Sequence, residues 1–224
     1  SNNNKYIWFT SISLIISSYI SPNFSFFFIY FLFFFLKKME LKKIFLLLFF
    51  NFLSAIPIFY YIFVLDVNFL ISGSTPGQSG ESVALDFNLS NKIMIISSIV
   101  FFHLSPVLLN NKFYKDFYHF ILKYGLVLLL PILILIYFFN YQTTYTGGGI
   151  FFNLSNLLFN NDYLFFIVSF FSISFMVFFS YKNSNNFYLL SLLVLSNLQN
   201  SIYHKYYEPL VLIMFFTLFQ NVGE

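Results

Sequence analysis

Residues 66–91 read DVNFLISGSTPGQSGESVALDFNLSN, and this is the only long stretch of the chain that is polar enough to lie in water. It holds three of the eight acidic residues and three of the eight glycines. Segments of this length without periodicity are uncommon inside compact domains, and where they occur they are functional or disordered. Because the sequence on both sides is strongly apolar, we interpret the stretch as an external loop of a polytopic membrane protein.

The composition excludes a soluble fold. Hydrophobic residues make up 59% of the chain and charged residues 8%, whereas charged residues make up about 25% of an average globular domain. The absence of cysteine excludes disulfides, thiolate catalysis and thiolate metal sites, and we expect no metal site and no cofactor. The lysines lie at the ends of apolar runs rather than in a basic stripe, so nucleic acid is not an expected partner.

The apolar runs predict an all-α fold, a polytopic transmembrane helical bundle of about eight helices forming a single membrane domain over residues 1–224. A helix needs roughly 20 residues to cross about 30 Å of hydrocarbon, and shorter helices cross where the bilayer thins. The predicted spans are residues 6–20, 24–36, 44–65, 93–109, 120–139, 163–179, 187–197 and 210–219. The shortest of these include re-entrant candidates.

The connections between the spans fall into two groups. Residues 66–91, 140–162 and 198–208 are the predicted external loops, whereas residues 110–119 and 181–186 are predicted inner connections. Within the second external loop, a run of three glycines is followed by apolar residues at helical spacing, namely Ile150, Phe151, Leu154, Leu157 and Leu158. This pattern predicts a glycine hinge and a short amphipathic helix lying in the membrane interface.

Lysine positions predict the orientation, because lysine is enriched in short loops on the cytoplasmic side. The predicted path places only Lys92 and Lys205 outside, and the inner lysines are Lys5, Lys37, Lys38, Lys42, Lys43, Lys112, Lys115, Lys123 and Lys182. Both termini are then cytoplasmic. The sequence therefore predicts a multi-pass integral protein of a cell inner membrane or an endomembrane, with the lipid bilayer as its surroundings.

Few residues within the predicted spans could carry chemistry. No charged residue lies in the middle of a span, which argues against an ion-coupled transporter. His103 is the polar exception, and we expect it to hydrogen-bond to a neighbouring helix.

The other candidates are all in predicted external loops, Glu81 and Asp86 in the first and His204, Lys205, Tyr207 and Glu208 in the last. Histidine and lysine beside glutamate suit the phosphate of a lipid whose tail lies between helices. An aromatic belt with a lysine reaching the surface also explains the last loop.

Two stretches carry a family resemblance. The first is a Gly/Ser-rich external loop followed by Asp86-Phe87-Asn88 and a helix that ends near Pro106, and the second is Lys205-Tyr206-Tyr207-Glu208-Pro209-Leu210 before the last span. Both resemble the dolichyl-phosphate-glucose-dependent alpha-1,2-glucosyltransferases. The resemblance implies a type-C membrane glycosyltransferase fold, an external active site and a polyprenyl-phosphate sugar donor.

This family places its catalytic acid in the first external loop. Here the first external turn, Ser21-Pro22-Asn23, contains no acid, and Glu40 is the only acid before Asp66. The resemblance therefore implies the C-terminal part of a longer enzyme, and the catalytic residue is unknown.

Two functions follow from the sequence. The first is an integral membrane glycosyltransferase, a fragment or a divergent member, that transfers a sugar from a polyprenyl-phosphate-linked donor at the external or lumenal face. Its substrate-binding residues would be His204, Lys205, Tyr207, Glu208, Glu81 and Asp86. The alternative is a non-catalytic multi-span subunit, such as an organelle-encoded accessory protein of a respiratory complex, that packs against membrane-protein partners. A transporter is disfavoured further by the lack of an internal repeat.

Overall fold

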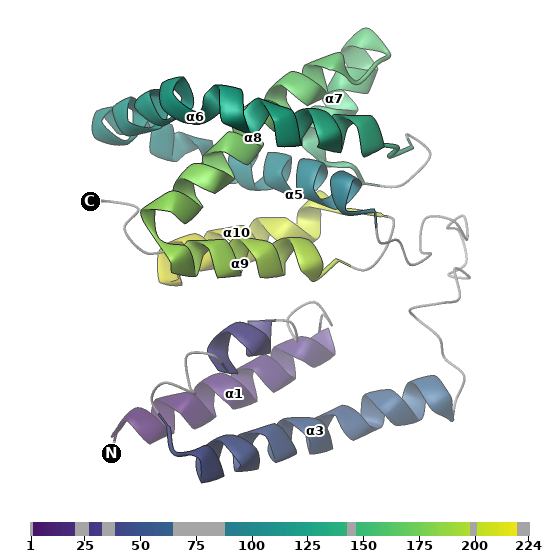
Figure 1. The fold of residues 1–224 in the computed structure, drawn as a ribbon. Coiled ribbons are helices and arrows are strands. Elements are labelled where there is room, and N and C mark those ends of the chain that lie inside the picture. Colours follow the sequence, from purple (N-terminus) through teal and green to yellow (C-terminus); the bar gives the residue numbers. More distant parts are fainter. Residues whose placement is uncertain are drawn as a thin grey trace. The chain divides into compact units, whose positions relative to one another are not determined.

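The structure, a computed structural model, describes residues 2–20, 27–32, 39–64, 88–142, 147–197 and 201–218. Every regular element within these ranges is a helix (Figure 1). The all-α prediction is therefore confirmed for the described residues. The chain divides into two compact units, Ser1–Ser72 and Gly73–Glu224, where the sequence predicted one membrane domain.

The first unit is built on α1 (Asn2–Ile20) and α3 (Leu41–Phe63). Trp8 of α1 meets Phe50 of α3 edge to face, with ring centroids 6.2 Å apart. Leu47 is 1% exposed and packs against Phe28, Phe31 and Met39. The predicted span 6–20 is thus helical, and the predicted span 44–65 is helical as far as Phe63. Only residues 27–32 of the predicted span 24–36 are described, and they are helical as well.

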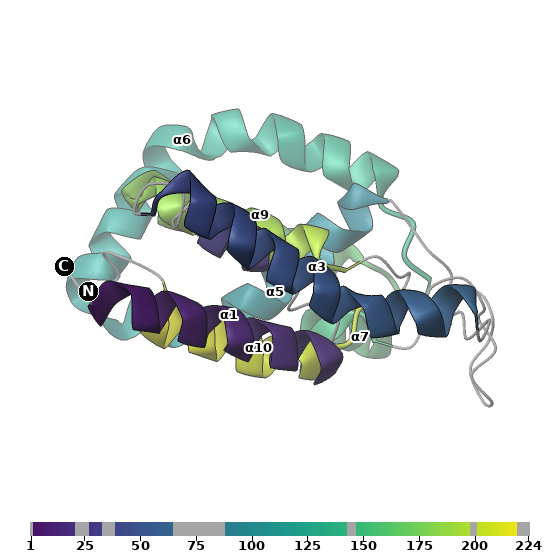
Figure 2. The ribbon, with the colours of Figure 1, turned by 90° about the horizontal axis from the view of Figure 1, so that it is seen from below.

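In the second unit, α5 (Leu89–Leu104) is the central helix. It contacts α6 (Asn111–Phe138), α7 (Gly149–Phe159), α8 (Tyr163–Lys182), α9 (Ser184–Leu195) and α10 (His204–Thr217). Its most deeply buried apolar side chains, at most 1% exposed, are Met94, Ile95, Ile96, Ile99 and Val100. Ser97 and Ser98 are fully buried too, and each hydroxyl donates to a carbonyl of its own helix. Such small side chains let neighbouring helices approach closely, and a Cβ added at Gly149, the first residue of α7, would lie 3.6 Å from the Ser98 hydroxyl. Figure 2 shows the ribbon turned by 90°, with α9 and α10 in this unit.

The helix α6 is longer than predicted, because the predicted inner connection 110–119 forms its first turns. The Asn110 side chain caps the helix by accepting from the backbone N–H groups of Lys112 and Phe113, at 3.0 and 3.3 Å. The phenylalanines at 113, 117 and 120 share one helix face and are buried. They pack against Phe175, Phe178 and Phe179 of α8. Residues 111–119 were predicted to be a connection because many of them are polar, but they form the first turns of an amphipathic helix.

Two further predicted connections are also largely helical. Asn183 is the only residue between α8 and α9, so the predicted turn 181–186 is reduced to one residue. The predicted external loop 198–208 becomes helix from His204 onward, and α10 continues through Pro209. The short helix predicted after the three glycines is confirmed as α7.

Three helical segments of the described residues are long and apolar enough to cross a membrane, compared with the eight predicted spans. They are Leu89–Leu109, in which α5 is extended by the 3-10 helix η1 (Ser105–Leu109), and the whole of α6 and α8. The 12 residues of α9 and the 14 of α10 would span only about 18 and 21 Å at 1.5 Å per residue. The predicted spans 187–197 and 210–219 are therefore too short to cross an unthinned bilayer.

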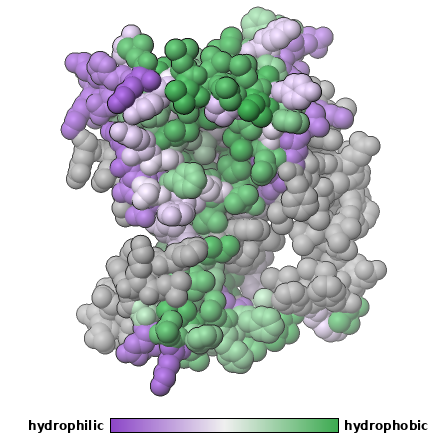
Figure 3. Space-filling view, viewed as in Figure 1, coloured by the Kyte–Doolittle hydropathy of each residue, from purple (hydrophilic) through white to green (hydrophobic). Residues whose placement is uncertain are grey.

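The surface of α6 is strongly apolar. Leu126 is 87% exposed and Val127 70%. Figure 3 shows hydrophobic side chains across the upper part of the view, where α6 lies in Figure 1, with hydrophilic side chains at both edges. Soluble monomers rarely expose large contiguous apolar patches, so the second unit is consistent with a membrane protein.

Candidate functional site

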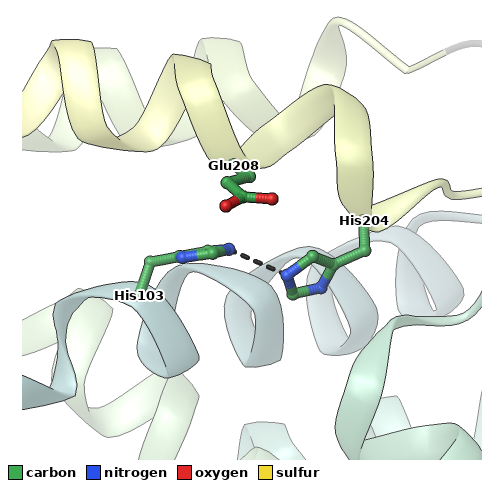
Figure 4. Close-up of side chains that lie close together, drawn as sticks. All are labelled: His103, His204 and Glu208. Carbon is green, nitrogen blue, oxygen red and sulfur yellow. Dashed lines mark hydrogen bonds between the residues drawn. The ribbon is translucent and has the colours of Figure 1, made fainter.

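His103 near the end of α5 and His204 at the start of α10 face each other (Figure 4). Their Nε2 atoms are 2.8 Å apart, and the ring planes are inclined by 46°. Glu208 follows His204 by one helical turn and therefore lies on the same face of α10. One ligand atom from each of the three side chains lies within 4.8 Å of the others. We call this group the His-His-Glu cluster.

The segment that leads into α10 is fixed by the loop before α7. The carbonyl of Ile202 accepts from the Gly148 N–H at 2.9 Å, and the Ile202 N–H donates to the Tyr141 hydroxyl at 3.2 Å. Gly147 has φ 112°, and a Cβ there would clash with the Ile202 carbonyl, 2.8 Å from its carbon and closer to its oxygen. Glycine is needed for this close approach. The glycines predicted to form a hinge therefore hold the backbone of Ile202, two residues before His204, in place. We call the contacts of Gly147 and Gly148 with the Ile202 carbonyl the clamp.

The two histidines are partly buried, and Glu208 is exposed. Phe102 packs edge to face against both rings, at centroid distances of 5.2 and 5.6 Å. Burial and the nearby His103 lower the pKa of His204, whereas Glu208 raises it. Its Nδ1 is buried and has no hydrogen-bond partner among the described residues. The lowered pKa of His204 favours the neutral imidazole, which is the form that binds metal ions.

The six substrate-binding residues predicted from the sequence are not all brought together. His204 and Glu208 lie in the cluster. The Lys205 ammonium lies over the rings of Tyr203 and Tyr206, at 5.3 and 5.2 Å, and Tyr207 is 2% exposed in the core. Glu81 and Asp86 lie outside the described residues.

The predicted hydrogen bond from His103 to a neighbouring helix is confirmed. Its partner was missed, because His204 was assigned to an external loop and His103 to the inner half of a span. The structure places residues 201–204 beside the second half of α5, where Gly149 also packs closely against Ile99. His204 therefore lies against α5, within the second unit, rather than in an external loop. The only local indication in the sequence was the helical spacing of His204 and Glu208.

Two imidazoles and a carboxylate form a ligand set that zinc commonly uses. The sequence predicted no metal site, yet the structure brings together three side chains that could hold an ion. No family model, no curated protein and no solved structure matches the chain. The chemistry of the cluster therefore has to be judged from its own residues.

Proposed function

We propose that this chain is a multi-span membrane protein that binds a divalent transition-metal ion, best matched by zinc, through His103, His204 and Glu208. The observation that carries the proposal is the convergence of three ligand atoms within 4.8 Å, from two helices that are 101 residues apart at the histidines. Catalytic zinc sites use three protein ligands of this kind and leave a fourth position for water or substrate. Because Glu208 is exposed, the fourth position on the ion would be open to water or substrate.

The geometry needs only side-chain movement to accept zinc. Bond lengths of about 2.0–2.2 Å in a tetrahedral site put neighbouring ligand atoms about 3.3 Å apart. The two Nε2 atoms, now 2.8 Å apart, would separate by about 0.5 Å to reach that spacing. The Glu208 carboxylate would move inward, which an exposed side chain can do by changing rotamer. Zinc would replace the hydrogen bond between the two rings.

The unpaired Nδ1 of His204 limits the expected affinity. A zinc ion on Nε2 leaves the ring proton on Nδ1, and this atom has no hydrogen-bond partner among the described residues. Metal-ligating histidines usually donate that proton to a carboxylate, carbonyl or water, and loss of such a partner costs about 10–100-fold in affinity. We therefore expect zinc to bind more weakly than at a structural zinc site.

The membrane topology of the proposal uses α5 with η1, α6 and α8 as spans, and α3 as a fourth, since α3 has 23 residues with lysines only near its start. The cytoplasmic end is the one at which α6 begins and α8 ends, because lysines gather there. The chain has no native cysteine, so single cysteines can be labelled selectively. Lys115→Cys should react with an impermeant reagent only from the cytoplasmic side, and Gln142→Cys only from the other. Labelling of both from one side would contradict this topology.

Sugar transfer from a polyprenyl-phosphate donor stays a prediction from the sequence, as does a non-catalytic membrane subunit. Of the residues predicted for the donor, only His204 and Glu208 lie together in the described part of the chain. Lys205 instead contacts tyrosine rings. The proposed metal site does not depend on either prediction.

The test is to measure zinc binding to the full chain in lipid nanodiscs by calorimetry. We expect one zinc ion per chain. His103→Ala and His204→Ala should each lower the affinity by more than about 100-fold, since removing a direct ligand costs more than removing an outer partner. The matched control is His119→Ala, because His119 is exposed on α6 and lies outside the cluster. Unchanged zinc affinity in the double variant of His103 and His204 would overturn the proposal.

A further inference from the structure

A second site lies between α6 and α8 and shares no residue with the His-His-Glu cluster. It is a cavity of about 290 Å³ at the end where α6 begins and α8 ends. Its polar and aromatic lining includes Asp116, His119, Lys123, Tyr124, Tyr181 and Lys182. Its size is at the lower end of the range for ligand pockets, about 300–1,000 Å³, which suits a small polar group rather than a whole large ligand.

The charges of the cavity leave an excess of one positive charge. The Lys182 ammonium lies 3.3 Å from the Asp116 carboxylate and 4.8 Å from the centre of the Phe113 ring. The side chain of Lys182 is only 21% exposed. Lys123 adds a second ammonium, 5.1 Å from the Tyr124 ring centre. Two lysines and one carboxylate thus line the cavity, and lysine binds phosphate as a point charge.

The remaining wall is aromatic and merges with an apolar helix surface. Tyr124 and Tyr181 lie 6.0 Å apart, and Phe120 contacts both. Leu122 and Leu126 on the neighbouring surface of α6 are 65% and 87% exposed. A ligand with a phosphate at the lysines could therefore extend a hydrocarbon chain along α6. Tyrosine side chains also favour the boundary between lipid and water.

We propose that this cavity binds the phosphate group of an anionic phospholipid, with Lys123 and Lys182 at the phosphate and the aromatic wall beside the glycerol. The lysine distribution assigns this end of α6 and α8 to the cytoplasmic side. Anionic lipids are enriched in the cytoplasmic leaflet, and basic pockets between helices on that side bind their headgroups. The proposed metal site is not needed for this inference.

Asp116 gives the inference a distinctive consequence. The incoming phosphate has to compete with this carboxylate for Lys182. Removing the carboxylate without changing side-chain shape, as in Asp116→Asn, should therefore tighten lipid binding. If the ion pair only joined α6 to α8, loss of either partner would act in the same direction and weaken the protein.

The test is native mass spectrometry of the full chain in detergent, titrated separately with phosphatidylglycerol, phosphatidylcholine and inorganic phosphate. Each lysine that contacts the phosphate directly contributes about 1 kcal/mol through its hydrogen bond, so the double variant Lys123→Gln/Lys182→Gln should bind phosphatidylglycerol about 30-fold more weakly. The matched control is Lys115→Gln, which removes one charge from the same part of α6 outside the cavity lining, and it should stay within about twofold. Asp116→Asn should bind phosphatidylglycerol more tightly than the wild type.

Several results would overturn the proposal. These are equal binding of the two lipids, a double variant that behaves like Lys115→Gln, or weaker binding by Asp116→Asn. If the double variant does not fold, the comparison of the two lipids and the Asp116→Asn variant decide the matter. Binding of inorganic phosphate with the same dependence on the lysines, without binding of phosphatidylglycerol, would reject the lipid as the source and assign the cavity to a soluble phosphate compound.

Discussion

The substitution Gly147→Ala should release the clamp that positions His204. Gly147 has φ 112°, and an added Cβ would meet the Ile202 carbonyl. The unfavourable backbone conformation costs about 1–2 kcal/mol for an L-residue. Displacing Ile202 would also break its hydrogen bond to the Gly148 N–H, at a net cost of about 0.5–1.5 kcal/mol. We therefore expect a loss of about 1.5–3.5 kcal/mol in the free energy of unfolding.

The same displacement should reach the metal site, because Ile202 precedes His204 by two residues. If the full loss acts on the orientation of His204, zinc affinity falls by about 10–300-fold, since 1.4 kcal/mol corresponds to a factor of ten. The assays are denaturant unfolding in nanodiscs or mixed micelles and zinc calorimetry on the same preparations.

The matched control is Gly125→Ala inside α6. A Cβ there would lie 3.5 Å from Ile121 and 3.8 Å from Phe170, which are ordinary contact distances. The change should leave stability unchanged or raise it by up to about 1 kcal/mol through helix propensity. Equal unfolding free energies and equal zinc affinities for the two alanine variants would refute the reasoning about the clamp.

Two other predictions concern buried polar groups and pH. Tyr141→Phe removes the acceptor of the Ile202 N–H and should cost about 1–3 kcal/mol of unfolding free energy. Tyr163→Phe, at a side chain that is 72% exposed, should change it by less than about 0.5 kcal/mol; equal losses would contradict this contrast. Burial lowers the pKa of His204 from 6.5, so on acidification this histidine takes up a proton more readily in the unfolded chain than in the folded one. The zinc-free protein should therefore lose unfolding free energy as the pH falls from 6.5 to the lowered pKa, and no more from this group below it. Unfolding free energies measured between pH 7.5 and about 5 test the sign, and a gain on acidification would show that His204 is protonated more readily in the folded state.

The helices that the sequence predicted best are those with continuous apolar runs. The residues of α8 are apolar almost throughout, and α7 has apolar residues at helical spacing after three glycines. Hydropathy failed at residues 110–119, where polar residues mask a buried face of phenylalanines. There the helix depends on the Asn110 cap and on packing against α8. Tertiary contacts of this kind do not appear in a local pattern.

The candidate site was harder to predict for a similar reason. His204 and Glu208 could be singled out because they are polar residues near an apolar helix. Their partner His103 is 101 residues earlier in the chain, and no local spacing joins the two. The contact depends on the path of residues 201–204, which is set by the backbone at Gly147 and Gly148. Assignment of 198–208 to an external loop therefore separated two side chains that the fold brings together.

The most direct test of the metal site is X-ray absorption at the zinc edge, measured on the full chain in nanodiscs loaded with one equivalent of zinc. The account predicts a first shell of about four nitrogen and oxygen ligands at about 2.0–2.1 Å, with the multiple-scattering pattern of two imidazoles that is reduced to one in His103→Ala. An all-oxygen shell, or a two-imidazole pattern that persists in His103→Ala, would contradict it.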